Sequence, residues 1–103
     1  MNHEDFNEHL NQRLAKIIAV LGKKAAEYSS DNDLLHNFKV HAALNGITPE
    51  QAAWYLAGKH LVSIRDMVVS GRGYHREAWD EKIGDAINYL ILLEAIVLER
   101  SNV

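Results

Sequence analysis

Four polar residues interrupt an apolar stretch in the middle of the chain. Lys59, Ser63 and Asp66 are spaced four and three residues apart, so they share one face of a helix. His60 flanks this row and shares an edge with Ser63. These side chains have the chemistry to bind an anion, transfer a proton or ligate a cation, and the row is the first candidate site.

A second polar row lies further along the chain. Glu81, Asp85 and Asn88 repeat the same spacing, and Lys82, Asp85 and Tyr89 form an overlapping set. If the two rows face each other, they form a charged groove between two helices. Burying such groups is unfavourable unless they are paired or hold a ligand.

Two interpretations of the groove stay open at this point. In the first, the groove binds a ligand. In the second, the rows only stabilise the fold, because Lys59 pairs with Asp66 and Lys82 pairs with Asp85 across the helix interface.

The elements that position these residues are predicted to be helices, because apolar residues recur every three or four positions. Residues Ser29–Asp33 break the first helix and offer an N-cap for the second. No stretch alternates as a strand does. We therefore expect an all-α bundle of three long helices and one short one, covering residues 1–28, about 34–45, about 49–69 and about 77–100.

The ends of the middle helices carry specific signals. Asn45-Gly46 is typical of a helix C-terminus with a left-handed glycine, and Ile47 can fold back on the last turn. Thr48-Pro49-Glu50 is typical of a helix start. Residues 70–73, with two glycines, are expected to form the loop before the last helix.

Composition sets the class of protein. The 103 residues fit one domain, residues 1–103, and contain no cysteine, which excludes disulfides, thiolate nucleophiles and Cys-ligated metals. Eleven Lys and Arg against 14 Asp and Glu give a net charge of −3, which disfavours an extended nucleic-acid surface. The longest apolar run, Ala86–Leu98, is too short to cross a bilayer. We expect a cytoplasmic protein with no membrane partner.

The same run predicts self-association. Ala86–Leu98 is apolar nearly all round the helix, and three other helices of a short chain can hardly cover every side of it. A homo-oligomer that buries the remaining face is the favoured explanation. The alternative is a central helix that its own chain encloses.

Four segments together resemble a known family. Asp33–Lys39, Gly46–Glu50, Lys59–Met67 and Glu81–Leu90 resemble the nucleotide-modification-associated domain of phages and prophages. That family is similar to the all-α nucleotide pyrophosphohydrolases of the MazG and dUTPase type. The resemblance covers roughly residues 25–99 and implies a MazG-like helical bundle, a dimer or higher oligomer, and a nucleotide bound between helices.

The MazG-type enzymes hold Mg²⁺ with an ExxE motif on one helix and an ExxD motif on the next. Here the second motif is Lys82-Ile-Gly-Asp85, with Glu81 adjacent, and Lys59, His60 and Ser63 occupy the region of the first. Lysine in place of carboxylate suits direct pairing with phosphate oxygens better than a cage for several metal ions.

The favoured function is therefore binding of a phosphorylated nucleotide in an interhelical or inter-subunit pocket, without catalysis and without a bound cofactor. Lys59 and Lys82 would neutralise phosphate. Ser63, Asn88 and Asn37 would donate hydrogen bonds, and the ring of Tyr89, His60 or Phe38 would stack on the base. In a phage, such a protein would sequester a nucleotide signal of host defence in the host cytoplasm. The expected contact residues are Asn37, Phe38, Lys59, His60, Ser63, Asp66, Lys82, Asp85, Asn88 and Tyr89.

Two alternatives stay open. One is a Mg²⁺-dependent nucleoside triphosphate pyrophosphohydrolase with Asp66, Glu81 and Asp85 as metal ligands. In that enzyme His60 would be the base, and His60, Asp66 and Asp85 would be the catalytic residues. The other is a structural or interaction module without a ligand.

Overall fold

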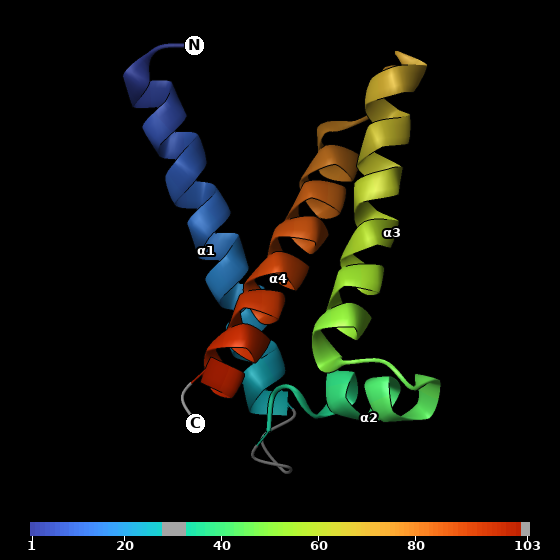
Figure 1. The fold of residues 1–103 in the computed structure, drawn as a ribbon. Helices are drawn as coiled ribbons and strands as arrows, with labels where there is room; N and C mark the ends of the chain where they lie inside the picture. Colours follow the sequence, from blue (N-terminus) through green and yellow to red (C-terminus); the bar gives the residue numbers. More distant parts are fainter. Residues whose placement is uncertain (28–32, 102–103) are drawn as a thin grey trace. The chain divides into compact units, whose positions relative to one another are not determined.

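The computed structural model of the chain describes residues 1–27 and 33–101. Within these residues all regular structure is helical: α1 (His3–Glu27), α2 (His36–Asn45), α3 (Pro49–Ser70) and α4 (Arg76–Ser101) (Figure 1). The all-α class, with three long helices and one short one, is thus confirmed for the described residues. The chain divides into two compact units, Met1–Leu34 and Leu35–Val103. That residues 1–103 form one domain stays a prediction.

The first unit contains α1, which is amphipathic. Its N-terminus is capped by Asn2, whose Oδ1 accepts a hydrogen bond of 2.8 Å from the Asp5 backbone N–H. The predicted apolar stripe is present on the helix, and Phe6, Leu10 and Leu14 are each between 42 and 49% exposed. Within its own unit, therefore, α1 leaves its apolar face uncovered.

The second unit is built on the α3–α4 pair, with α2 packed on α3. Its core cluster consists of Leu35, Phe38, Ala53 and Ile96, drawn from the start of α2, from α3 and from α4. Three alanines of α3 are fully buried, namely Ala52, Ala53 and Ala57. Because alanine is small, these positions allow close contact between helix backbones.

The boundaries of α3 confirm the predicted signals. Thr48 Oγ1 accepts from the Gln51 backbone N–H at 3.1 Å, and Gln51 Oε1 accepts from the Thr48 N–H at 2.9 Å, which completes a capping box with Pro49 in the first turn. At the other end Gly71 has φ +65°, a left-handed conformation that glycine adopts without strain.

The end of α2 is also as predicted, but its start is not. Gly46 has φ +64°, and the Ile47 N–H donates to the Ala42 carbonyl at 3.0 Å. The cap expected from Ser29–Asp33 is wrong: the N-cap residue is Leu35, which makes no side-chain cap hydrogen bond. Its side chain is instead buried in the core, so packing sets this boundary. The predicted break at residues 29–32 lies outside the described residues.

Removing the Thr48 cap should destabilise the second unit measurably. Thr48→Ala leaves an N-terminal N–H of α3 without its acceptor, so the free energy of unfolding should fall by about 1 kcal/mol. Urea denaturation followed by circular dichroism measures this change. Thr48→Ser keeps the hydroxyl and should stay close to wild type, and an equal loss in both variants would contradict a capping role.

None of the described helices combines the length and the apolar character that a bilayer span requires.

Candidate functional site

One histidine of α3 meets two side chains of α4. The His60 and Tyr89 rings are stacked, with centroids 5.1 Å apart and planes inclined by 21°. His60 Nδ1 lies 3.7 Å from Asp85 Oδ2, a contact that becomes an ion pair when the imidazole is protonated. Asp85 and Tyr89 are four residues apart and therefore lie on one face of α4. Both predicted polar rows thus contribute to the same contact.

The contact continues to α2. Phe38 meets Tyr89 edge to face, with centroids 6.3 Å apart and planes at 84°. We call Phe38, His60, Asp85 and Tyr89 the His60 cluster. It runs from the apolar core, where Phe38 is 8% exposed, to His60 and Asp85, whose side chains are 24 and 40% exposed. The cluster therefore has a buried aromatic end and a polar end that reaches solvent.

Asn88 is a buried polar residue of α4 that directly precedes Tyr89 in the sequence. It follows Asp85 by three positions on α4 and is 9% exposed. Its Oδ1 is buried and has no hydrogen-bond partner among the described residues. A buried acceptor without a donor costs about 1–3 kcal/mol of folding free energy. Buried acceptors in folded proteins are usually paired, either with protein donors or with ordered water.

The remaining predicted residues lie nearer to solvent. Ser63 is half-buried, and its hydroxyl donates to the Lys59 carbonyl of its own helix at 3.1 Å. Asp66 is exposed and accepts from its neighbour Arg65 at 3.2 Å. Lys82 is half-buried, and the three others, Asn37, Lys59 and Glu81, are exposed.

The expected lysine pairs are not formed. Within the described part of the chain, no ion pair joins Lys59 to Asp66 or Lys82 to Asp85. Asp66 pairs with Arg65 instead, because the two side chains are adjacent on the exposed side of α3, and Asp85 faces His60. The interpretation of the two rows as these mutual salt bridges is wrong.

The carboxylates predicted as metal ligands also do not gather around a common point. Residues 1–27 and 33–101 contain no group of three His, Asp or Glu side chains that is arranged to hold a metal ion. Asp66, Glu81 and Asp85, the ligands of the hydrolase interpretation, therefore do not form a preassembled site. That interpretation stays a prediction without geometric support.

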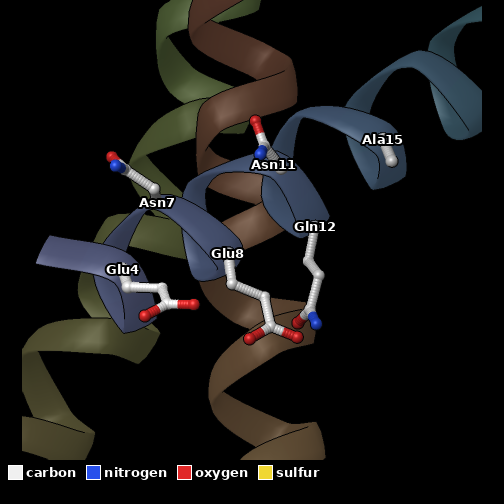
Figure 2. Close-up of a pocket in the computed structure, with 6 residues that line it drawn as sticks. All are labelled: Glu4, Asn7, Glu8, Asn11, Gln12 and Ala15. Carbon is white, nitrogen blue, oxygen red and sulfur yellow. The ribbon is translucent and has the colours of Figure 1, made fainter.

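A hollow on α1 is not among the sites predicted from the sequence. Its walls come from one face of this helix, and it is open to solvent (Figure 2). The lining residues are mostly acids and amides, spaced three and four positions apart: Glu4, Asn7, Glu8, Asn11, Gln12 and Ala15. This spacing is visible in the sequence, but it equally describes the solvated side of an amphipathic helix. With no second wall, the hollow has little capacity to enclose a ligand.

Comparison with protein-family models, with curated proteins and with solved structures found no match to this chain. The resemblance to the phage family therefore stays a prediction based on the four sequence segments.

Proposed function

We propose that this protein binds a phosphorylated nucleotide at the polar end of the His60 cluster. The observation that carries the proposal is the buried Oδ1 of Asn88, which has no hydrogen-bond donor among the described residues and belongs to the residue that directly precedes Tyr89 on α4. Nucleobases carry N–H donors and a flat ring, so one ligand class would satisfy the amide and extend the stack.

The charges near the cluster suit the phosphates of such a ligand. Lys82 is three residues before Asp85 on α4, and Lys59 precedes His60 on α3. Neither lysine is paired with the acid expected for it, so both ammonium groups retain hydrogen-bonding capacity for phosphate oxygens. The protein's net charge of −3 does not oppose this, because a small anion responds mainly to the charges next to it.

Self-association belongs to the same proposal. Large apolar side chains of the second unit are exposed on both long helices, including Trp54 at 51%, Val68 at 65% and Leu98 at 57%. Apolar surface of this extent is typical of an interaction site. We infer a homo-oligomer with a MazG-like arrangement, encoded by a phage and acting in the host cytoplasm, where it would sequester a nucleotide signal of host defence.

Thermal-shift screening against nucleoside mono-, di-, tri- and cyclic phosphates tests ligand binding. A ligand at 100 times its dissociation constant should add about 2.7 kcal/mol of stability, which raises the melting temperature by roughly 10 °C or more. Lys59→Ala and Lys82→Ala should each weaken binding about tenfold or more, because each removes a charge-assisted contact to phosphate.

The matched control is Lys16→Ala, which removes one exposed cation from α1 and should leave the affinity unchanged. A flat screen contradicts nucleotide binding. Release of pyrophosphate from a triphosphate that depends on Mg²⁺ would favour the hydrolase instead.

A further inference from the structure

The end of α2 carries an asparagine–glycine pair. Asn45 is the last residue of the helix and Gly46 is its C-cap, and both residues are exposed. No other asparagine of the 103-residue chain precedes a glycine. A Cβ placed on Gly46 would meet no atom of the described residues within 4 Å, so the surroundings of the pair are open on that side. Such a pair can react with itself, because glycine has no side chain to hinder its backbone nitrogen.

The reaction open to this pair is loss of the side-chain amide of Asn45. The Gly46 backbone nitrogen attacks Cγ of Asn45, the new C–N bond closes a five-membered succinimide ring, and the bond between Cγ and Nδ2 breaks. The proton of the attacking nitrogen goes to the leaving amide, which departs as ammonia. Water then opens the ring at either carbonyl carbon and gives aspartate or isoaspartate. One water is consumed and one ammonia is released, with no change of oxidation state.

Two hydrogen bonds of the folded chain oppose this reaction. Nδ2 of Asn45 donates to the His41 carbonyl at 2.8 Å, which anchors the side chain toward the preceding turn of α2. The Gly46 N–H donates to the Ala42 carbonyl, so the attacking nitrogen belongs to the hydrogen-bonded end of the helix. Ring closure requires Cγ to lie against the Gly46 nitrogen and that nitrogen to lose its proton. Both hydrogen bonds must therefore open before the pair can react.

We propose that Asn45–Gly46 is a self-modification site that the folded end of α2 protects, and that the pair reacts when this end of the helix opens. Local opening near helix ends requires less free energy than global unfolding. The helix has only 10 residues, and helices shorter than about 12–15 residues are marginal in water without tertiary packing. Its two buried residues, Phe38 and Ala42, supply that packing. The rate of amide loss at Asn45 therefore reports how often α2 opens.

The modified residue weakens the end of α2. Both products lose the Nδ2 donor to His41 and place a carboxylate at the negative end of the helix dipole. Isoaspartate also adds one methylene to the main chain directly before Gly46. The N–H groups of Gly46 and Ile47 both donate to the Ala42 carbonyl, and the longer main chain displaces them from it. Because ammonia has left, the change is irreversible, and a transient opening of α2 becomes a lasting one.

Peptide mapping by mass spectrometry of the full chain, aged at neutral pH with and without urea, tests the site. Amide loss at Asn45 should be about tenfold or more slower in buffer than in urea, since only the open fraction reacts. Asn11, an exposed amide followed by glutamine, is the internal control and should stay largely intact in both samples. Equal rates at Asn45 in the two samples would contradict protection by α2, and an intact Asn45 in urea would contradict the site itself.

Matched variants separate the opening of α2 from the chemistry of the pair. Ala42→Gly lowers the helix propensity of α2 by about 1 kcal/mol, so the rate at Asn45 in buffer should rise about fivefold or more while the rate in urea stays the same. Ala15→Gly makes the same change at an exposed position of α1 and should leave both rates unchanged. Gly46→Ala should slow the reaction in urea, where the strain of a left-handed alanine plays no part.

Hydrogen exchange measures the consequence for the helix. The isoaspartate form, separated from aged protein by chromatography, should exchange the amides at the C-terminal end of α2 about tenfold or more faster than the fresh protein. An unchanged rate of amide loss in Ala42→Gly, or unchanged exchange in the modified form, would overturn the proposal. None of these measurements involves a nucleotide, so their outcome is independent of the proposed function.

Discussion

Replacing Phe38 with alanine is expected to lower the free energy of unfolding by about 3–5 kcal/mol. The side chain is 8% exposed and belongs to the core cluster with Leu35, Ala53 and Ile96. It also meets the Tyr89 ring edge to face. The substitution therefore removes buried apolar area, leaves a cavity and deletes an aromatic contact, and all three effects destabilise the unit.

The size of the unit makes this loss severe. Stability of about 0.05–0.15 kcal/mol per residue gives a three-helix unit of this length only about 3–10 kcal/mol. Phe38→Ala should thus unfold much of the population at 25 °C, as circular dichroism and urea titration will report. Leu44→Ala, on the same helix but 80% exposed, should change stability by less than about 0.5 kcal/mol. Similar losses in the two variants would show that the core is not where the structure places it.

The burial of Phe38 also bears on the stacking on a nucleobase that is expected of it. From the sequence, Phe38 is one of three rings expected to stack on a base. At 8% exposed it offers a ligand little surface, and its contact with Tyr89 is internal to the second unit. Spacing along the chain could not show this, because it identifies the face of a helix on which a residue lies but not what covers that face.

The ends of the helices were predictable where interactions between neighbouring residues determine them. Thr48 with Gln51 caps α3, and Gly46 and Gly71 take the left-handed conformation that ends a helix, so the signals act within a few residues. The start of α2 was not predictable in the same way. Leu35 occupies its N-cap position because burial of the leucine in the core outweighs the lost cap.

The candidate site was predictable only in part, because helical spacing is local whereas the contacts between helices depend on packing. Helical spacing places Lys59, Ser63 and Asp66 on one face of α3, but it does not say which of them meets α4. The structure brings His60 to Asp85 and leaves Lys59 and Asp66 exposed, because the rotation of α3 follows its buried alanines. Only packing of the two helices decides such pairings.

Replacing Asn88 with leucine should change stability and binding in opposite directions. Leucine has a similar volume and no polar atom, so it removes the unpaired acceptor and should raise the free energy of unfolding by about 1–3 kcal/mol. In the same variant the thermal shift produced by the nucleotide should be largely lost, since the donor on the base no longer finds its acceptor. A residue that served only the fold would not combine these two effects.

Two measurements on three proteins decide the Asn88 prediction: urea denaturation and the nucleotide-induced thermal shift of the wild type, Asn88→Leu and Asn11→Leu. Asn11 is an exposed amide on α1, so its substitution should change stability by less than about 0.5 kcal/mol and leave the nucleotide shift intact. If Asn88→Leu destabilises the protein and keeps the full nucleotide shift, the amide serves the fold alone. Nucleotide recognition would then have to depend on the lysines and the His60–Tyr89 ring pair without it.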